Sequence, residues 1–220
     1  MTLTGLRHES AYLDEEMQRR LLADVLSVVA AAPLYTPTMP RTGRPMSVRM
    51  TNCGPLGWVT DKAEGYRYQA THPATGEPWP PMPPALLRIW QEVSGATVEP
   101  EACLVNHYVG AAKLGLHQDR DEQEMSVAVV SVSLGDDAWF RVGGLDRRAP
   151  SERLLLRSGD VVVLGGVARM AHHGIDRIVP GTSNLLASAG LAEGGRINLT
   201  MRRVTPCGAW QEAGNPPQKH

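Results

Sequence analysis

Apolar residues recur every three or four positions near the start of the chain. Between residues 14 and 32 they stand at Met17, Leu21, Val25 and either Val28 or Val29. This spacing places them on one face of a helix. Asp14 can cap the first turn, and Pro33 cannot continue the helix. The pattern therefore predicts a helix over about residues 14–32, with one face packed on the rest of the protein.

The pattern changes beyond residue 103, where short segments rich in β-branched residues follow one another. Eight of them are separated by turns that contain Gly or Asp: "CLVNHYV", "LGLHQD", "SVAVVSVSL", "AWFRV", "RLLL", "DVVVLGG", "HGIDRIV" and "RINLTMR". Strands without intervening helices favour two packed antiparallel sheets. We therefore expect a mostly β chain with flanking helices (α+β), built on a double-stranded β-helix, that is, a jelly-roll or cupin-like barrel.

The region between these two parts contains many prolines and glycines. "MSVRMTN" and "YRYQ" alternate like short strands on either side of the turn-rich "CGPLGW", which predicts a small hairpin lid. "HPATGEPWPPMPP" reads as an ordered loop that leads into a short helix over residues 85–93. We expect one domain over residues 1–206, with a lid at about 36–82, a core at about 103–204 and a frayed tail at 207–220.

Composition adds limits to this picture. The chain has 220 residues, 42% hydrophobic and 20% charged, with a formal net charge of −1. These values are typical of one globular domain. The near-zero net charge does not indicate a basic surface for nucleic acid, so any binding of nucleic acid would depend on a local site. The three cysteines share no metal spacing, and no secretion signal or membrane-length apolar run is visible. We expect a cytoplasmic monomer with no membrane role and no protein partner.

Candidate metal ligands follow an apolar pair in "KLGLHQDRDE". In an extended strand His117, Asp119 and Asp121 would point to the same side. A third ligand can come from "MAHHGIDR", where His172 and His173 would face opposite ways and spacing does not choose between them. Two imidazoles and a carboxylate suit Fe(II) and leave positions open for a chelating co-substrate and dioxygen. The alternative is a solvated turn with two charges.

The last predicted strand, "RINLTMR", has one apolar and one polar side. Ile197, Leu199 and Met201 form the first; Arg196, Asn198, Thr200 and Arg202 form the second. The two arginines stand roughly 20 Å apart along the strand, so they could approach opposite ends of a short dicarboxylate. The alternative is a half-exposed edge strand whose arginines meet solvent.

Together these segments resemble the AlkB family of Fe(II)/2-oxoglutarate-dependent nucleic-acid demethylases. The segments that carry the resemblance run in the family's order from about residue 46 to 202: "MSVRMTNCGPLGW", "CLVNHY", "KLGLHQDRDE", "VSVSLG", "LLLRSGDVVVLGG", "HHGI" and "RINLTMR". By resemblance, the catalytic iron would be held by His117, Asp119 and His173. The 2-oxoglutarate contacts would be Asn106, Tyr108, Arg196, Asn198 and Arg202. The substrate contacts would be Trp58, Tyr66, Tyr68, Asp121 and Arg147.

The resemblance also implies an activity. It is oxidative demethylation of bases such as 1-methyladenine and 3-methylcytosine in DNA, with O2 as oxidant and formaldehyde, succinate and CO2 as products. Such a base must leave the stack, and Trp58 facing His117 across it would form a sandwich. Asp121 could accept a hydrogen bond from the exocyclic amine of the cationic base. We expect DNA, single-stranded, as the substrate. The alternatives are RNA, a small molecule, or a barrel that binds metal without catalysis.

Overall fold

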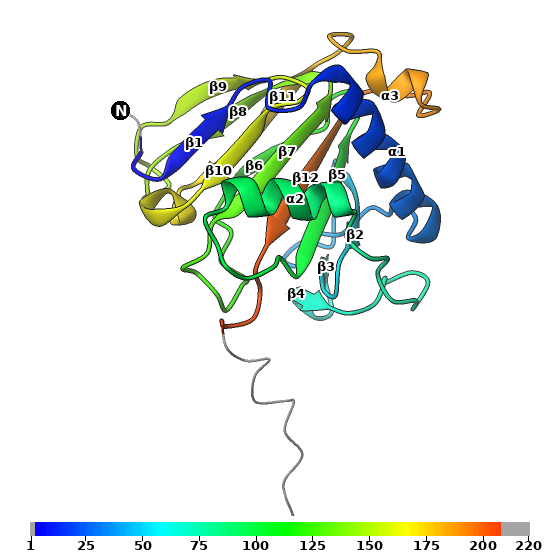
Figure 1. Ribbon diagram of the computed structural model, residues 1–220. Helices are drawn as coiled ribbons and strands as arrows, with labels where there is room; N and C mark the ends of the chain where they lie inside the picture. The colour runs from blue at the N-terminus through cyan, green and yellow to red at the C-terminus, as the bar shows by residue number, and fades with distance from the viewer. Residues whose placement is uncertain (1–2, 208–220) are drawn as a thin grey trace, which may run out of the picture.

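Two antiparallel sheets face each other in the structure, a computed structural model that describes residues 3–207 (Figure 1). The strands of the larger sheet are, in spatial order, β1 (Leu6–Glu9), β10 (Val161–Leu164), β7 (Val129–Gly135), β12 (Arg196–Arg202), β5 (Ala102–Tyr108) and β2 (Arg49–Cys53). Those of the smaller sheet are β6 (Leu114–His117), β11 (His173–Val179), β8 (Asp137–Val142) and β9 (Glu152–Leu156). The expected jelly-roll architecture is confirmed, and each of the eight predicted strands is present.

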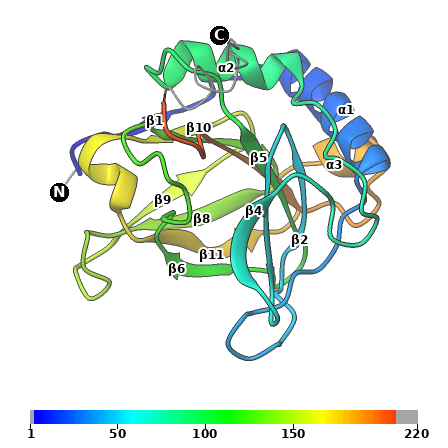
Figure 2. The same cartoon turned by 90° about the horizontal axis from the view of Figure 1, so that it is seen from below.

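Two helices cover the outer face of the larger sheet. They are α1 (Glu15–Ala31) and α2 (Pro84–Val93), and Figure 2 shows them on the opposite side of this sheet from β6, β8 and β11. Asp14 caps α1, because its carboxylate accepts a hydrogen bond from the backbone N–H of Met17. Leu21 and Trp90, one from each helix, belong to the core that lies between helices and sheet. Both helices agree with the sequence prediction.

The side-chain alternation of β12 divides the molecule into two cores. Its residues Ile197, Leu199 and Met201 pack with α1 and α2 on the outer side. Its polar residues therefore face the space between the sheets, where a second core of residues such as Phe140 and Val162 fills part of the barrel. All seven residues of β12 are buried, so it is a central strand. The alternative, a half-exposed edge strand whose arginines meet solvent, is excluded.

The lid hairpin pairs differently from the prediction. β4 (Gly65–Gln69) contains "YRYQ", as expected, but its partner is β3 (Gly57–Asp61), which begins inside "CGPLGW". The strand in "MSVRMTN" is β2, and it pairs with β5 at the edge of the larger sheet. The side chain of Met50 favours the pairing of β2 with β5, because it is apolar and is buried in the second core, between the two sheets.

The remaining loops and the C-terminal residues complete the description of the fold. The 182–195 loop, for which no structure was predicted, contains a helical turn, α3 (Leu185–Ser188), and its Leu186 packs in the core with residues of α1. A short 3-10 helix, η1 (Gly166–Met170), precedes β11. The expected frayed tail lies outside the described residues except for Cys207. In the described part of the chain, no helix combines the length and apolarity that crossing a membrane requires.

Candidate active site

Strands β6 and β11 bring two distant histidines together. His173 is the direct cross-strand partner of His117, and the centroids of their rings lie 4.5 Å apart. A glycine at the next position of β11 permits this approach: a Cβ atom on Gly174 would lie 2.5 Å from the carbonyl oxygen of Leu114. Any larger residue at position 174 would force the two strands apart.

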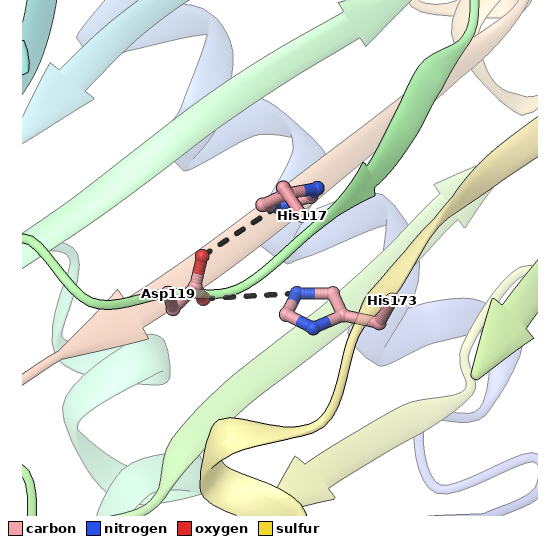
Figure 3. Close-up of side chains that lie close together, drawn as sticks. All are labelled: His117, Asp119 and His173. Atoms are coloured by element: carbon pink, nitrogen blue, oxygen red, sulfur yellow. Dashed lines mark ion pairs between the residues drawn. The ribbon is translucent and has the colours of Figure 1, made fainter. Parts of the chain in front are cut away.

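Asp119 completes a cluster of three possible metal ligands (Figure 3). Its Oδ1 lies 3.5 Å from Nε2 of His117, and its Oδ2 lies 3.8 Å from Nε2 of His173. One ligand atom from each residue falls within 4.8 Å of the others. The expectation that an extended strand reaches Asp121 is wrong, because β6 ends at His117. The loop after β6 therefore places Asp119.

The histidine rings are oriented for metal binding. Nδ1 of His117 lies 2.9 Å from the carbonyl oxygen of Gly115, and Nδ1 of His173 lies 3.0 Å from that of Ala171. A carbonyl oxygen can only accept, so each Nδ1 carries the proton. The Nε2 atom of each ring then faces Asp119. A carbonyl that fixes the remote ring nitrogen is a common feature of metal-binding histidines.

The protonation states also suit a metal. Burial lowers the pKa of His173 to about 4. Burial acts in the same direction on His117, but its hydrogen bond with Asp119 and the charge of that group outweigh it, so the pKa of His117 is raised. Burial works against ionisation of Asp119, yet the charge of Arg202 and the contact with His117 hold its pKa well below the usual range. Near neutral pH the cluster thus offers an ionised carboxylate and a neutral imidazole, the forms that coordinate metal.

The polar side of β12 faces matching residues of β5. Tyr108 is the cross-strand partner of Arg196, and Asn106 is that of Asn198. Arg196 is 0% exposed and donates to the carbonyl oxygen of Asp136 and to the hydroxyl of Ser133. Burial lowers its pKa to about 10, so it remains a cation near neutral pH.

This polar layer suits an anionic ligand. In the part of the chain that the structure describes, no carboxylate forms an ion pair with Arg196, and its Nε has no hydrogen-bond partner. Nη1 of Arg202 and Oδ1 of Asn106 are also buried without a partner. Buried donors without an acceptor are costly, and the two carboxylates of a dicarboxylate would supply acceptors for Nε of Arg196 and Nη1 of Arg202. The residues present therefore fit 2-oxoglutarate.

The metal cluster opens into a cavity of about 770 Å³. Of the predicted site residues, the cavity is lined by Trp58, Tyr66, Asn106, Tyr108, His117, Asp119, Asp121, Arg147, His173, Asn198 and Arg202. Trp58 and Tyr66 are stacked, with ring centroids 5.6 Å apart and ring planes inclined by 23°. The indole N–H of Trp58 donates to Oδ2 of Asp121 at 2.8 Å. The lid hairpin thus contributes an aromatic pair to the cavity of the metal cluster.

Two predicted residues lie away from the cavity wall. Arg196 is buried beside Tyr108 and is absent from the lining residues, and Tyr68 is absent too. The hydroxyl of Tyr68 donates instead to Glu122. The adjacent histidine that the sequence left open, His172, lines the cavity, but its Nδ1 faces the carbonyl oxygen of Gly144 and it is outside the metal cluster.

Residues 5–202 match the family model of the 2OG-Fe(II) oxygenase superfamily. Over 192 residues the chain is 51% identical to an alpha-ketoglutarate-dependent dioxygenase AlkB homolog of Caulobacter vibrioides, which covers 87% of this chain and 84% of that protein. The chain belongs to the AlkB family. Its resemblance to the alpha-ketoglutarate-dependent dioxygenase AlkB of Escherichia coli is 43% identity over 189 residues, or 84% of each chain.

A solved structure extends this family assignment to the fold. The structure of OsALKBH1 superposes with a TM-score of 0.77 at 30% identity and covers 92% of this chain and 100% of that one. The chain is therefore an Fe(II)/2-oxoglutarate-dependent dioxygenase that uses Fe(II), 2-oxoglutarate and O2. The family, the enzyme class and the cofactors expected from the sequence are confirmed.

Two charged residues of this AlkB-family site were not predicted. Glu122 and Arg169 form a buried ion pair next to the metal cluster, and both contact residues that the prediction includes. Glu122 stands in the predicted segment "KLGLHQDRDE", where it reads as one more solvated acid, and Arg169 lies 47 positions away in η1. An arginine close to the candidate metal ligands of "HHG" is the one signal for the pair that the sequence contains.

Proposed function

We propose that this enzyme removes methyl groups from N-alkylated bases in nucleic acid, with single-stranded DNA as the preferred form. The observation that carries the proposal is that the stacked pair of Trp58 and Tyr66 lines the same cavity as the cluster of His117, Asp119 and His173. An aromatic pair beside a metal site suits a flat substrate that must be held against the oxidant.

The proposed metal ligands are Nε2 of His117, one carboxylate oxygen of Asp119 and Nε2 of His173. When bound, Fe(II) with 2-oxoglutarate and O2 supplies oxidation of the N-methyl carbon, which leaves as formaldehyde while succinate and CO2 are formed. Three protein ligands leave room for such a co-substrate. The chain itself supplies the oriented imidazoles and the ionised carboxylate described above.

The proposed co-substrate contacts are Asn106, Tyr108, Arg196, Asn198 and Arg202. Arg202 is held by Asp119, with its Nη1 unpartnered, so it can donate to a carboxylate at the metal end of the cavity. Arg196 lies at the other end of the same strand, and a second carboxylate would compensate its buried charge. Two cations at the two ends favour a dicarboxylate over a monocarboxylate.

The proposed substrate contacts are Trp58, Tyr66, Tyr68, Asp121 and Arg147. Trp58 or Tyr66 would stack on the extruded base, and this contact would replace part of the stacking between the two rings. A base methylated on its pairing edge, such as 1-methyladenine, is cationic and keeps an exocyclic amine. The carboxylate of Asp121, which now accepts from the indole of Trp58, would accept from that amine and stabilise the positive charge. Arg147 is exposed on the cavity rim, where a phosphate can reach it.

RNA is the second candidate substrate. More distant relatives are named as a DNA N(6)-methyladenine demethylase of Arabidopsis thaliana and a tRNA demethylase of Schizosaccharomyces pombe. A side-by-side experiment separates the two. DNA and RNA oligomers of one sequence, each with a single 1-methyladenine, are incubated at equal concentration, and initial rates of methyl loss are compared. We expect the DNA oligomer to react faster; a faster RNA reaction would make RNA the substrate.

The metal assignment is tested in the same assay. His117→Ala should abolish methyl loss while the thermal unfolding midpoint stays close to that of the wild type. Asp119→Ala should abolish it too, with a lower midpoint, because Arg202 loses one of its two buried carboxylate partners. Normal turnover by both folded variants would remove these residues from the metal site.

A further inference from the structure

The ion pair of Glu122 and Arg169 has no direct place in the chemistry proposed above. Both side chains are 2% exposed, and Nη2 of Arg169 lies 3.1 Å from Oε2 of Glu122. We propose that this pair positions the metal-binding Asp119 and the co-substrate-binding Arg202. The inference rests on the proposed function, because it takes the roles of those two residues from it.

Arg169 holds the backbone around Asp119. Its Nη1 donates to the carbonyl oxygen of Asp119 at 2.6 Å, and its Nε donates to that of Val127 at 3.1 Å. One guanidinium therefore joins both ends of the segment from 119 to 127, which lies in a loop and has no strand ladder of its own. Because η1 leads directly into β11, the same arginine links this loop to the strand that begins with His173.

Glu122 holds the side chain of Arg202. Its Oε1 lies 3.1 Å from Nε of Arg202, and Nη2 of Arg202 contacts Oδ2 of Asp119 at 2.8 Å. Two carboxylates thus occupy two of the three guanidinium nitrogens, and Nη1 is left without a partner. The hydroxyl of Tyr68 on the lid donates to the same Oε1 at 2.5 Å. Glu122 therefore fixes Arg202 in one orientation, with one nitrogen available to a ligand.

The charges of this cluster balance. Asp119 and Glu122 carry two negative charges, and Arg169 and Arg202 carry two positive charges, all on buried residues. A divalent metal and a dianionic co-substrate would add two charges of each sign and preserve the balance. Removal of Glu122 or Arg169 alone would leave a buried charge without its partner, which disturbs both the fold and the site.

A purely structural ion pair behaves differently from a positioning pair when both members are replaced. Apolar residues of similar volume often substitute for a buried ion pair with little loss of stability. A pair that orients metal-binding groups cannot be replaced in this way, since loss of such partners commonly weakens metal binding roughly 10- to 100-fold. The double substitution therefore separates the two roles.

The experiment uses the full chain with Glu122→Leu and Arg169→Met combined. Mn(II) affinity is measured from the electron paramagnetic resonance signal of free Mn(II), and 2-oxoglutarate affinity by calorimetry on the Mn(II)-loaded protein. We expect the Mn(II) dissociation constant to rise about 10-fold or more and 2-oxoglutarate binding to weaken as well, with the thermal midpoint almost unchanged. The matched control, Glu16→Leu with Arg20→Met, replaces an exposed ion pair on α1 and should leave both affinities unchanged.

A second variant covers the case in which the double variant does not fold. Arg169→Lys keeps the charge opposite Glu122 but cannot donate in three directions, so it should also weaken Mn(II) binding. Affinities within twofold of the wild type in either folded variant would overturn the proposal. Loss of folding in both variants would overturn it too, because the pair would then be a requirement of the fold.

The proposed function is checked separately in the same measurements. Wild-type protein that binds no Mn(II), or a His117→Ala variant that binds it as tightly as the wild type, would contradict the metal site itself.

Discussion

His117 and His173 are cross-strand partners on β6 and β11, and their rings lie with centroids 4.5 Å apart. Two residues that are distant in sequence thus share one register position, and the geometry of the metal cluster depends on the spacing of two strands. Asp119, from the loop after β6, only has to turn back towards this pair. Changes that move the strands should therefore affect metal binding before they affect the rest of the barrel.

Gly174→Ala tests this dependence. The new Cβ would lie 2.5 Å from the carbonyl oxygen of Leu114 and 2.8 Å from that of Gly115, so β11 must move away from β6. We expect weaker Mn(II) binding and a loss of roughly 1–3 kcal/mol in the free energy of unfolding. The matched control is Gly115→Ala, where an added Cβ meets no atom within 4 Å. Equal effects of the two substitutions on Mn(II) affinity would contradict the account.

The low pKa of His173 predicts acid sensitivity of the metal-free protein. Its pKa is about 4 in the folded state, below the value of 6.5 for an ordinary histidine. Between these values the unfolded chain binds a proton that the folded protein does not, so stability falls as the pH falls from 6.5 towards 4. The loss due to His173 between pH 7 and pH 5 should be about 2 kcal/mol.

Urea unfolding at the two pH values measures this loss. His117 acts in the opposite direction, because a raised pKa contributes stability below pH 6.5 that is lost as the pH rises through its folded value. Comparison with His173→Leu isolates the contribution of His173. The variant should lose less free energy of unfolding than the wild type when the pH falls from 7 to 5. Parallel losses in the two proteins would show that His173 is not buried in its neutral form.

Arg196→Met tests the dicarboxylate site. Arg196 is 0% exposed, forms no direct ion pair with a carboxylate of the described residues and has an unpartnered Nε, so the carboxylate of a ligand would be a direct partner of its charge. Loss of one member of a buried charge pair commonly costs 2–5 kcal/mol, so the dissociation constant of 2-oxoglutarate should rise roughly 30-fold or more. Calorimetry on Mn(II)-loaded protein measures it. Arg177→Met, at an exposed position of β11, is the control. Unchanged affinity in the Arg196 variant would exclude this residue from the co-substrate site.

Trp58→Ala tests the aromatic lid. Stacking of a base on an aromatic ring contributes about 1–3 kcal/mol, so KM for a methylated oligomer should rise roughly 5- to 100-fold. Binding of 2-oxoglutarate should change little, and Trp58→Phe should restore most of the activity. Trp139→Ala, on the smaller sheet, serves as the matched control. If Trp58→Ala were as active as the wild type, the substrate would not stack on Trp58.

The sequence predicted those parts of the fold in which a local pattern coincides with the structure. The alternation of β12 is an example, because its apolar residues pack under the helices and its arginines face the barrel. β3 was missed for a physical reason: its five residues, "GWVTD", include Gly57 and Asp61, which are unfavourable in strands, and they follow a turn. Gly57 is required there, because a Cβ atom would lie 2.4 Å from the ring of Trp79.

In the candidate site, too, some residues could be predicted from sequence motifs, whereas others become recognisable only in the folded chain. His117, Asp119 and Arg202 stand in recognisable sequence motifs, so the sequence alone could nominate them, and the structure brings them to one cavity. Glu122 and Arg169 were not found, since an acid and an arginine 47 positions apart reveal nothing until the fold joins them. Tyr68 stays a predicted substrate contact; the sequence did not show that its hydroxyl donates to Glu122, a residue far from β4 in the chain.

The most direct test is mass spectrometry of a single-stranded DNA oligomer with one 1-methyladenine. It is incubated in air with the protein, Fe(II), 2-oxoglutarate and ascorbate. The account predicts loss of the methyl group, with no loss when 2-oxoglutarate is omitted or when His117→Ala replaces the wild type. An unchanged oligomer under the complete conditions, from protein that binds metal and 2-oxoglutarate, would contradict the proposed function.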